Sequence, residues 1–404
     1  MHTTNAVASG PPRRRRRARR LPVVAGVVAL LALVAAACVP PPPEPATGPS
    51  PNDAPRAAEP AYVGPGPYAA GVTTISLGDR DMEVWYPADP AAAGGVAPDE
   101  YFVRDFVAGW VEDLLDPSVN PPFVTDGYRG ITPAVADGPF PLVLFSHGFA
   151  GFRLTTTFLT THLASWGFVV IAPDYLERGL ASVLGDPVPG ARSDRVVADQ
   201  AIEAAKAASA TPGDLLEGLV DGSEVFPIGH SAGGGTSLRL LTRADVSSVI
   251  PMASGISELS LIQGNAPTLP RGKAITWLAG RYDGIAEVEN ARTGFTYTPG
   301  PRRLVELDRS GHNNAFTDLC EIGDGGIAAI ARATGLPIPS NLLALGDDGC
   351  PTPPFAPSPE VWDEVRHFVT AELRFRSGLD AEPVGLGDAV VPAFDDVLVY
   401  RHDP

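Results

Sequence analysis

The sequence predicts an α/β fold built on a mostly parallel central sheet with flanking helices, and two observations carry that prediction. From Pro141 onward, short and solidly apolar segments alternate with longer segments in which apolar residues have helical spacing. Strands that are apolar along their whole length are buried on both faces, and their alternation with helices is typical of a parallel sheet covered on both sides. In such sheets ligands bind at the carboxyl ends of the strands.

The elements follow in order along the chain. Residues 72–77 and 82–86 flank Gly78-Asp79 and predict a hairpin that begins the sheet. Residues 100–115 carry large apolar side chains at helical spacing and predict a helix, and the proline-rich stretch up to Pro139 predicts a loop. The remaining expected strands are 141–148, 167–175, 224–230, 248–254, 274–280 and 302–308, and the expected helices are 154–166, 193–208, the segment after Ser231 and 360–375.

The first 37 residues have the pattern of a signal peptide. An arginine-rich stretch precedes residues 21–37, which are apolar but too short for a membrane span. Arg19-Arg20 also fits a twin-arginine export signal, which the sequence does not distinguish from general secretion. Cys38 follows three alanines, as in a lipoprotein signal whose cysteine becomes acylated; an ordinary cleaved signal with a stray cysteine is the alternative. We therefore expect an exported protein, either secreted or held at the cell surface by lipid.

A tether is expected over residues 38–60, because residues 39–60 contain nine prolines and little that could be buried. The folded α/β domain is expected over residues 61–378, with a C-terminal extension over 379–404. Without residues 1–37 the chain keeps 23 basic and 47 acidic side chains, a net charge of −24. Such a surface disfavours nucleic acid and anionic lipid as partners. We expect a monomer that meets a membrane only through the lipid anchor.

Two cysteines, Cys320 and Cys350, remain if Cys38 is lipidated. In an exported protein they are expected to form a disulfide, with free thiols as the alternative. A bridge closing this loop would stabilise the fold by about 3–4 kcal/mol.

The sharpest motif is Gly229-His230-Ser231-Ala232-Gly233, a GxSxG sequence between an expected strand and an expected helix. This pattern places a nucleophilic serine on a tight turn, where small neighbours leave room for a strained backbone. A serine that merely occupies a turn is the alternative.

Two further residues follow later strands. Asp283 comes after residues 274–280 and His312 after 302–308, so that serine, aspartate and histidine occur in the order of α/β-hydrolases. Histidine accepts the serine proton, and a carboxylate orients the histidine. Glu287 or Glu289 could be the acid instead of Asp283. His147 and His230 lie inside the motifs and are expected to pack beneath the site rather than act as bases.

Backbone N–H groups must stabilise the oxyanion that forms during acyl transfer. Ala232 begins the helix after the serine, and Phe149 follows the strand that ends in Ser-His-Gly; these two residues are the expected donors. No cluster of histidine, cysteine and acidic residues has metal-ligand spacing, so neither a metal nor another cofactor is expected.

Four segments, FPLVLFSHGFAGFR, LASWGFVVIAPDY, GHSAGGG and GHNNAFTDLC, resemble the dienelactone-hydrolase-like group of secreted α/β-hydrolases. This group includes platelet-activating-factor acetylhydrolases and is similar to bacterial polyester (polyethylene terephthalate) hydrolases. The resemblance covers residues 66–376. It implies Ser231, Asp283 and His312 as the catalytic triad and the N–H groups of Phe149 and Ala232 as the oxyanion hole.

Two features qualify what the resemblance implies. True dienelactone hydrolases use cysteine as nucleophile, so their lactone chemistry does not carry over to a chain with serine at that position. Only residues 255–273 separate two of the later strands, which leaves no room there for a large lid. We therefore expect an open, shallow site, although the insertion at 100–120 could cover it.

Together these observations predict an exported serine carboxylic-ester hydrolase that acts through an acyl-enzyme on short-chain acyl or polyester-type esters, as in lipid degradation. An amidase or acyltransferase with the same triad is an alternative within enzymes. A non-catalytic cell-surface binding protein on the same fold is the alternative outside them.

Overall fold

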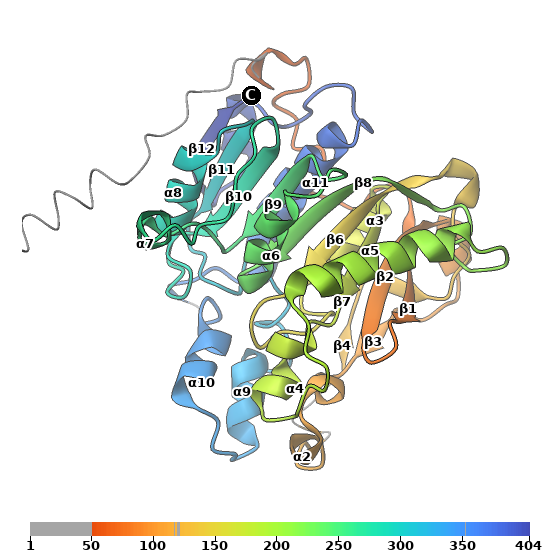
Figure 1. Cartoon of the computed structure of the whole chain (residues 1–404), viewed down its shortest axis with the longest axis vertical. Coiled ribbons are helices and arrows are strands. Elements are labelled where there is room, and N and C mark those ends of the chain that lie inside the picture. Colours follow the sequence, from red (N-terminus) through yellow and green to blue (C-terminus); the bar gives the residue numbers. More distant parts are fainter. Residues whose placement is uncertain (1–50, 117, 119–121, 352) are drawn as a thin grey trace, which may run out of the picture. The chain divides into compact units, whose positions relative to one another are not determined.

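Figure 1 shows the computed structural model of the protein, which describes residues 51–116, 118, 122–351 and 353–404. Ten strands form one sheet in the order β12-β11-β10-β9-β8-β6-β7-β2-β1-β5. Its strands are β1 (Ala69–Ser76), β2 (Asp81–Ala88), β5 (Gly127–Arg129), β6 (Phe140–Ser146), β7 (Val169–Pro173), β8 (Val220–His230), β9 (Ser248–Met252), β10 (Ala274–Gly280), β11 (Arg302–Leu307) and β12 (Val397–Asp403). A separate pair is formed by β3 (Glu100–Tyr101) and β4 (Phe123–Val124).

The middle of the sheet is parallel. Strands β7, β6, β8, β9, β10 and β11 pair in parallel. β1 and β2 form the expected antiparallel hairpin, which joins the sheet through β2 and β7. Every residue of β7 and of β10 is buried, as expected for apolar strands covered on both faces. The predicted α/β-hydrolase architecture is therefore confirmed.

Helices cover both faces of this sheet (Figure 1). One hydrophobic core contains apolar side chains of α3 and α11, and a second core contains those of α5, α6 and α8. The α-helices are α2 (Gly109–Glu112), α3 (Thr157–Ser165), α4 (Leu180–Val183), α5 (Asp194–Ala210), α6 (Ala232–Leu240), α7 (Glu258–Ile262), α8 (Val288–Tyr297), α9 (Gly326–Ala333), α10 (Ser340–Asp347) and α11 (Ser358–Arg376). Short 3-10 helices lie at Pro51–Asp53, Pro90–Ala93, Val103–Phe106, Val135–Asp137, Leu176–Arg178 and Asp388–Ala393.

The helix predicted over residues 100–115 is wrong. This segment consists of β3, the 3-10 helix Val103–Phe106 and the four-residue α2, with extended backbone at Val107 and Ala108. Its large side chains do not form one buried stripe, because Phe106 is buried while Trp110 is 49% exposed. The Phe106 ring stacks on that of Phe152 with centroids 4.3 Å apart, so tertiary packing has overridden the helical spacing.

The two ends of the described chain meet. Residues 51–60, the described part of the expected tether, dock on the C-terminal extension instead of running free. The Arg56 carbonyl accepts from the Gly385 N–H at 3.0 Å, and the Ala57 carbonyl accepts from the Gly387 N–H at 3.1 Å. The extension itself ends in β12, which pairs antiparallel with β11 and forms an edge of the sheet. The folded domain thus includes both of these segments.

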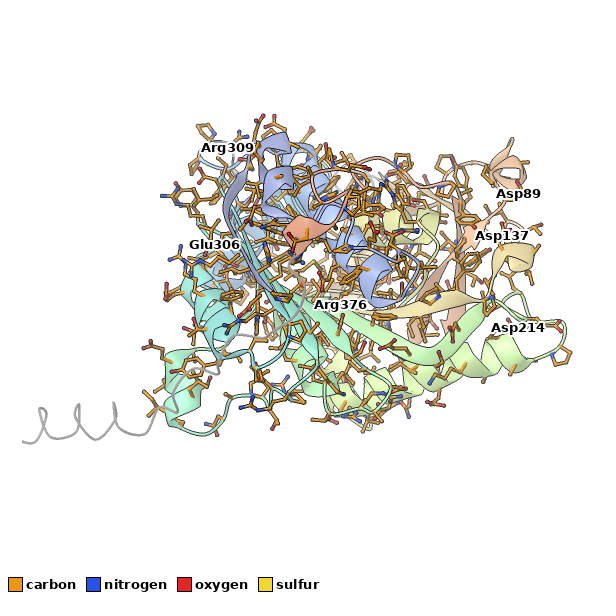
Figure 2. All side chains as sticks on the ribbon, turned by 90° about the horizontal axis from the view of Figure 1, so that it is seen from above. Asp89, Asp137, Asp214, Glu306, Arg309 and Arg376 are labelled. Atoms are coloured by element: carbon orange, nitrogen blue, oxygen red, sulfur yellow. A yellow bond between two sulfur atoms is a disulfide. The ribbon has the colours of Figure 1, made fainter. Side chains whose placement is uncertain are left out.

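Figure 2 labels several charged side chains, which lie on different sides of the domain. Glu306 lies on β11 and Arg309 follows this strand, near one edge of the sheet. The exposed carboxylates on the other side of the domain are those of Asp89, Asp137 and Asp214. Glu306 is fully buried and accepts two hydrogen bonds from Arg292, at 2.8 and 2.7 Å. The acidic surface inferred from the composition therefore includes solvated carboxylates, while the buried carboxylate of Glu306 is paired with a guanidinium group.

The expected signal peptide and Cys38 lie outside the described residues. Over the described ranges, no helix has both the length and the apolar character needed to cross a membrane.

Candidate active site

Ser231 occupies a strained turn between β8 and α6. Its backbone angles are φ 55° and ψ −120°, a conformation that costs energy for any residue with a side chain. The Ser231 N–H donates to the Met252 carbonyl on β9 at 2.9 Å, which fixes the turn to the neighbouring strand. The side chain is thereby presented at the carboxyl end of the parallel sheet, as the GxSxG motif predicts.

The glycines of the motif are required by close backbone approach. A Cβ atom on Gly229 would lie 2.4 Å from the Gly233 carbonyl oxygen, and one on Gly233 would lie 1.8 Å from the Ser146 carbonyl oxygen. Both distances are far below van der Waals contact. A Cβ on Gly148 would lie 3.1 Å from that of Ser231, which brings the loop after β6 against the serine. The small residues of the motif therefore let the serine turn approach β6.

Asp283 and His312 are hydrogen-bonded to each other. The His312 Nδ1 lies 2.8 Å from Asp283 Oδ2, and the two side chains are almost completely buried. The other carboxylate oxygen of Asp283 accepts from the N–H groups of Ile285 at 2.8 Å and Ala286 at 2.6 Å. With Nδ1–H donating to the carboxylate, the imidazole presents Nε2 as a proton acceptor.

The Nε2 atom of His312 is buried, and among the described residues it has no hydrogen-bond partner. This nitrogen is therefore free to accept a proton from a hydroxyl group that approaches it. Glu287 and Glu289, the alternative acids, are exposed, and Glu289 pairs with Arg292 at 3.2 Å. The geometry thus brings Asp283, and neither of the glutamates, to the histidine.

Two residues hold the His312 backbone, and one of them, Asp348, was not expected at the site from the sequence. Asp348 Oδ1 accepts from the His312 N–H at 2.7 Å, and its Oδ2 accepts from the Gly284 N–H at 3.0 Å. Burial raises the pKa of Asp348, and these two donors oppose that rise. On the other side, His230 Nε2 donates to the His312 carbonyl at 2.8 Å. Asp348 therefore joins the loop of the acid to the loop of the histidine.

Both histidines of the motifs lie beneath the site, as expected. Burial lowers the pKa of His230 well below its usual value, so its ring is neutral and supplies the Nε2–H donor. Burial likewise lowers the pKa of His147 to about 3. The His147 Nδ1–H donates to the Gly148 carbonyl at 2.8 Å, and its Nε2 accepts from the Tyr175 N–H at 3.0 Å. Neutral His147 thus orders the loop that begins at Gly148.

The two expected oxyanion donors lie at this loop and at the helix start. Ala232 is the first residue of α6, where N–H groups have no partner within their own helix. The Phe149 N–H donates to no described residue, while the following Ala150 N–H is used by the Arg178 carbonyl at 2.8 Å. Both N–H groups are therefore available to a ligand oxygen.

The site is more enclosed on one side than the sequence analysis expected. Beside His312 and Phe149 lies a pocket whose walls include residues of α9, α10 and α4 and of the insertion at 103–115. Helices α9 and α10 belong to the segment between Cys320 and Cys350, which the sequence analysis did not assign to any element of the fold. The expected disulfide closes this segment, with Cα atoms 4.9 Å apart. The segment 255–273 contributes no lining residue, as expected from its shortness.

No set of three or more histidine, cysteine, aspartate or glutamate side chains in the described ranges is arranged to hold a metal ion. The constellation at the carboxyl end of the sheet consists of a serine on a strained turn, a histidine oriented by a carboxylate, and two available N–H groups. Fold and site together define the class of α/β hydrolases.

Comparisons with known proteins point to more particular relatives. Residues 127–246, which include Ser231 but neither Asp283 nor His312, match the family described as Chlorophyllase. Cutinase est2 of Thermobifida alba is 29% identical over 196 residues, which are 47% of this chain and 59% of that protein. Cutinase 2 of Thermobifida cellulosilytica and cutinase cut1 of Thermobifida fusca are also 29% identical, over 68% and 56% of their lengths. The resemblance to polyester-hydrolase-like α/β hydrolases expected from the motifs is confirmed.

Proposed function

We propose that this protein is an exported serine carboxylic-ester hydrolase that acts on acyl or polyester-type esters through an acyl-enzyme. The observation that carries the proposal is the Asp283–His312 pair, whose Nε2 is buried and has no partner among the described residues. The strained Ser231 turn is joined to this pair through the preceding residue, His230, which donates to the His312 carbonyl at 2.8 Å. The similarity to proteins named cutinases supports an ester as the substrate, although the alignment spans only 59% of the first relative.

The mechanism follows from these groups. Ser231 Oγ attacks the ester carbonyl carbon while its proton passes to His312 Nε2, and the Asp283 carboxylate stabilises the resulting imidazolium. The carbonyl oxygen, now negative, accepts hydrogen bonds from the N–H groups of Phe149 and Ala232. Each such donor lowers the barrier by about 3 kcal/mol. The tetrahedral intermediate then expels the alcohol, which takes the proton from His312.

Deacylation repeats these steps with water as the nucleophile. His312 accepts a proton from water, the hydroxide oxygen attacks the acyl carbon, and Ser231 leaves with the proton returned by His312. The products are a carboxylic acid and the free enzyme.

The test is hydrolysis of p-nitrophenyl acetate and butyrate by the wild type and by Ser231→Ala. We expect the variant to fold and to lose turnover, since its hydroxyl serves chemistry rather than packing. Ser223→Ala, at the exposed beginning of the same strand, is the matched control and should keep wild-type turnover. Equal activity of Ser231→Ala and the wild type would overturn the proposal, as would absence of both ester hydrolysis and labelling by a serine-reactive phosphonate.

We further propose that the exported protein is anchored through an acylated Cys38. The supporting observations are the lipoprotein-like sequence around Cys38 and the pairing of the two remaining cysteines with each other. Intact mass of the protein purified from its native host should show a chain that begins at Cys38 and carries lipid. A chain that begins elsewhere, or an unmodified Cys38, would contradict this anchor.

A further inference from the structure

The pocket beside the candidate site has one wall built from the disulfide-closed segment. Helix α9 contributes Ile327, Ile330 and Ala331 to the lining, and α10 contributes Leu342 and Leu343. The leucines of α10 line the pocket, and no residue of this helix is buried. Part of their apolar surface is therefore not covered by protein. A ligand that covered this surface would be stabilised by the hydrophobic effect.

A second group of lining residues is also apolar. It is formed by Val103, Val107 and Val111 from the insertion and by Leu180 and Leu184 at α4. None of the described residues that line the pocket carries a carboxylate, an ammonium or a guanidinium group. The lining offers few polar partners, which excludes a charged or sugar-like ligand and fits a hydrocarbon chain.

The pocket borders the candidate site at its histidine and at the loop after β6, although Ser231 itself is not among the lining residues. Its lining includes His312 and four consecutive residues of the loop that carries the proposed oxyanion donor, from Gly148 to Gly151. An ester carbonyl whose oxygen points to the Phe149 N–H would direct its acyl chain along this loop. Tyr282 and Ile285, on the loop of Asp283, are about half exposed and do not line the pocket, so the alcohol has an open side by which to leave.

Resting on the hydrolase function proposed above, we propose that this pocket binds the extended hydrocarbon acyl chain of the substrate. The preferred substrates are then esters with acyl chains longer than the short ones expected from the motifs. The Cys320–Cys350 bridge joins the two ends of the segment that carries α9 and α10, and it holds this wall over the chain.

The test is kcat/KM for p-nitrophenyl esters from acetate to decanoate, with the leaving group held constant. Each methylene that enters an apolar pocket should raise kcat/KM by about threefold to fourfold until the pocket is filled. Ala331→Phe places a ring inside the pocket and should lower the ratio of kcat/KM for octanoate to kcat/KM for acetate by about fiftyfold. Ala333→Phe is the matched control, because Ala333 is exposed on the same helix and does not line the pocket.

Each outcome decides between alternatives. A circular dichroism spectrum and a thermal midpoint like those of the wild type check that Ala331→Phe folds, and a selective loss of octanoate hydrolysis then supports the acyl pocket. A wild-type profile that is flat or falls with chain length would overturn the inference while leaving the hydrolase proposal intact. The second arm is a series of alkyl acetates with alcohols of growing length. If kcat/KM rises with the length of the alcohol but not with the length of the acyl chain, and Ala331→Phe abolishes that rise, the pocket binds the alcohol and the acyl assignment is refuted.

Discussion

Asp348→Asn should impair catalysis although Asp348 is not a member of the triad. The carboxylate accepts one backbone N–H with each oxygen, from His312 at 2.7 Å and from Gly284 at 3.0 Å. Asparagine has a similar shape but only one acceptor oxygen, so one of the two N–H groups would face an amide NH₂ group. The variant therefore loses one hydrogen bond to a charged acceptor and brings two donors together.

The magnitude follows from the lost bond. A hydrogen bond to a charged group contributes about 1.5–3 kcal/mol. If the loss of this bond raises the free energy of the reactive position of the His312 loop by the same amount, the rate falls by about tenfold to a hundredfold. We expect kcat for p-nitrophenyl butyrate to fall by about that factor, with KM nearly unchanged because neither N–H group contacts substrate.

The neighbouring residue provides the control. Asp347 pairs with Arg332 on the surface, where such pairs contribute about 0–1 kcal/mol to stability, so Asp347→Asn should keep wild-type kcat. Wild-type kcat in a folded Asp348→Asn protein would refute the positioning role of Asp348. Equal loss in both variants would show instead that the segment responds to any change of charge.

Three further predictions concern the acid, a buried glutamate and the disulfide. Asp283→Asn should lower kcat by orders of magnitude because the amide favours the wrong imidazole tautomer, whereas Glu287→Gln should have little effect; the reverse result in steady-state kinetics would move the acid to Glu287. Burial raises the pKa of Glu364 to about 7, and its Oε2 has no partner among the described residues. Because the folded state holds this proton more tightly than the unfolded state, the stability of the wild type is greatest at low pH and falls as the pH rises toward about 7. In urea unfolding, Glu364→Gln should therefore gain up to about 3 kcal/mol over the wild type between pH 5 and pH 8. A gain that does not depend on pH would contradict this cause. Joint replacement of Cys320 and Cys350 by serine should lower the free energy of unfolding by about 3–4 kcal/mol in the same assay, and an unchanged midpoint would show that the bridge does not constrain the unfolded chain.

The centre of the fold could be predicted because the local sequence preferences and the tertiary packing favour the same structure there. The strand before Ser231, the turn at Ser231 and the helix after it are each specified by their own residues, through apolar runs and glycines. The neighbouring strands are apolar along their whole length, and that pattern has no stable alternative to burial in a parallel sheet.

The walls of the pocket could not be predicted in the same way. Helices α9 and α10 are only eight residues long each, and α10 has no buried residue, so their apolar spacing spans too few turns to identify them from the sequence. Their position depends on the pairing of Cys320 with Cys350 and on the residues they face across the pocket. Such partners are distant in sequence, and periodicity does not reveal them.

Asp348 shows why part of the site was also hidden. It belongs to no motif, and its function depends on the hydrogen bonds it accepts from two loops that precede it by 36 and 64 residues. The signal that could have found it is its position two residues before Cys350, because a bridge to Cys320 returns this segment to the histidine loop.

The docking of residues 51–60 on the C-terminal extension has a consequence for orientation. In Figure 1 these residues lie at the end of the domain that carries the C-terminus, whereas α9, α10 and α4 lie at the far end. A lipid anchor upstream of Pro51 would therefore pull on the end of the domain remote from the pocket. The pocket and the candidate active site would then face away from the cell surface, toward substrates that are too large or too insoluble to be imported.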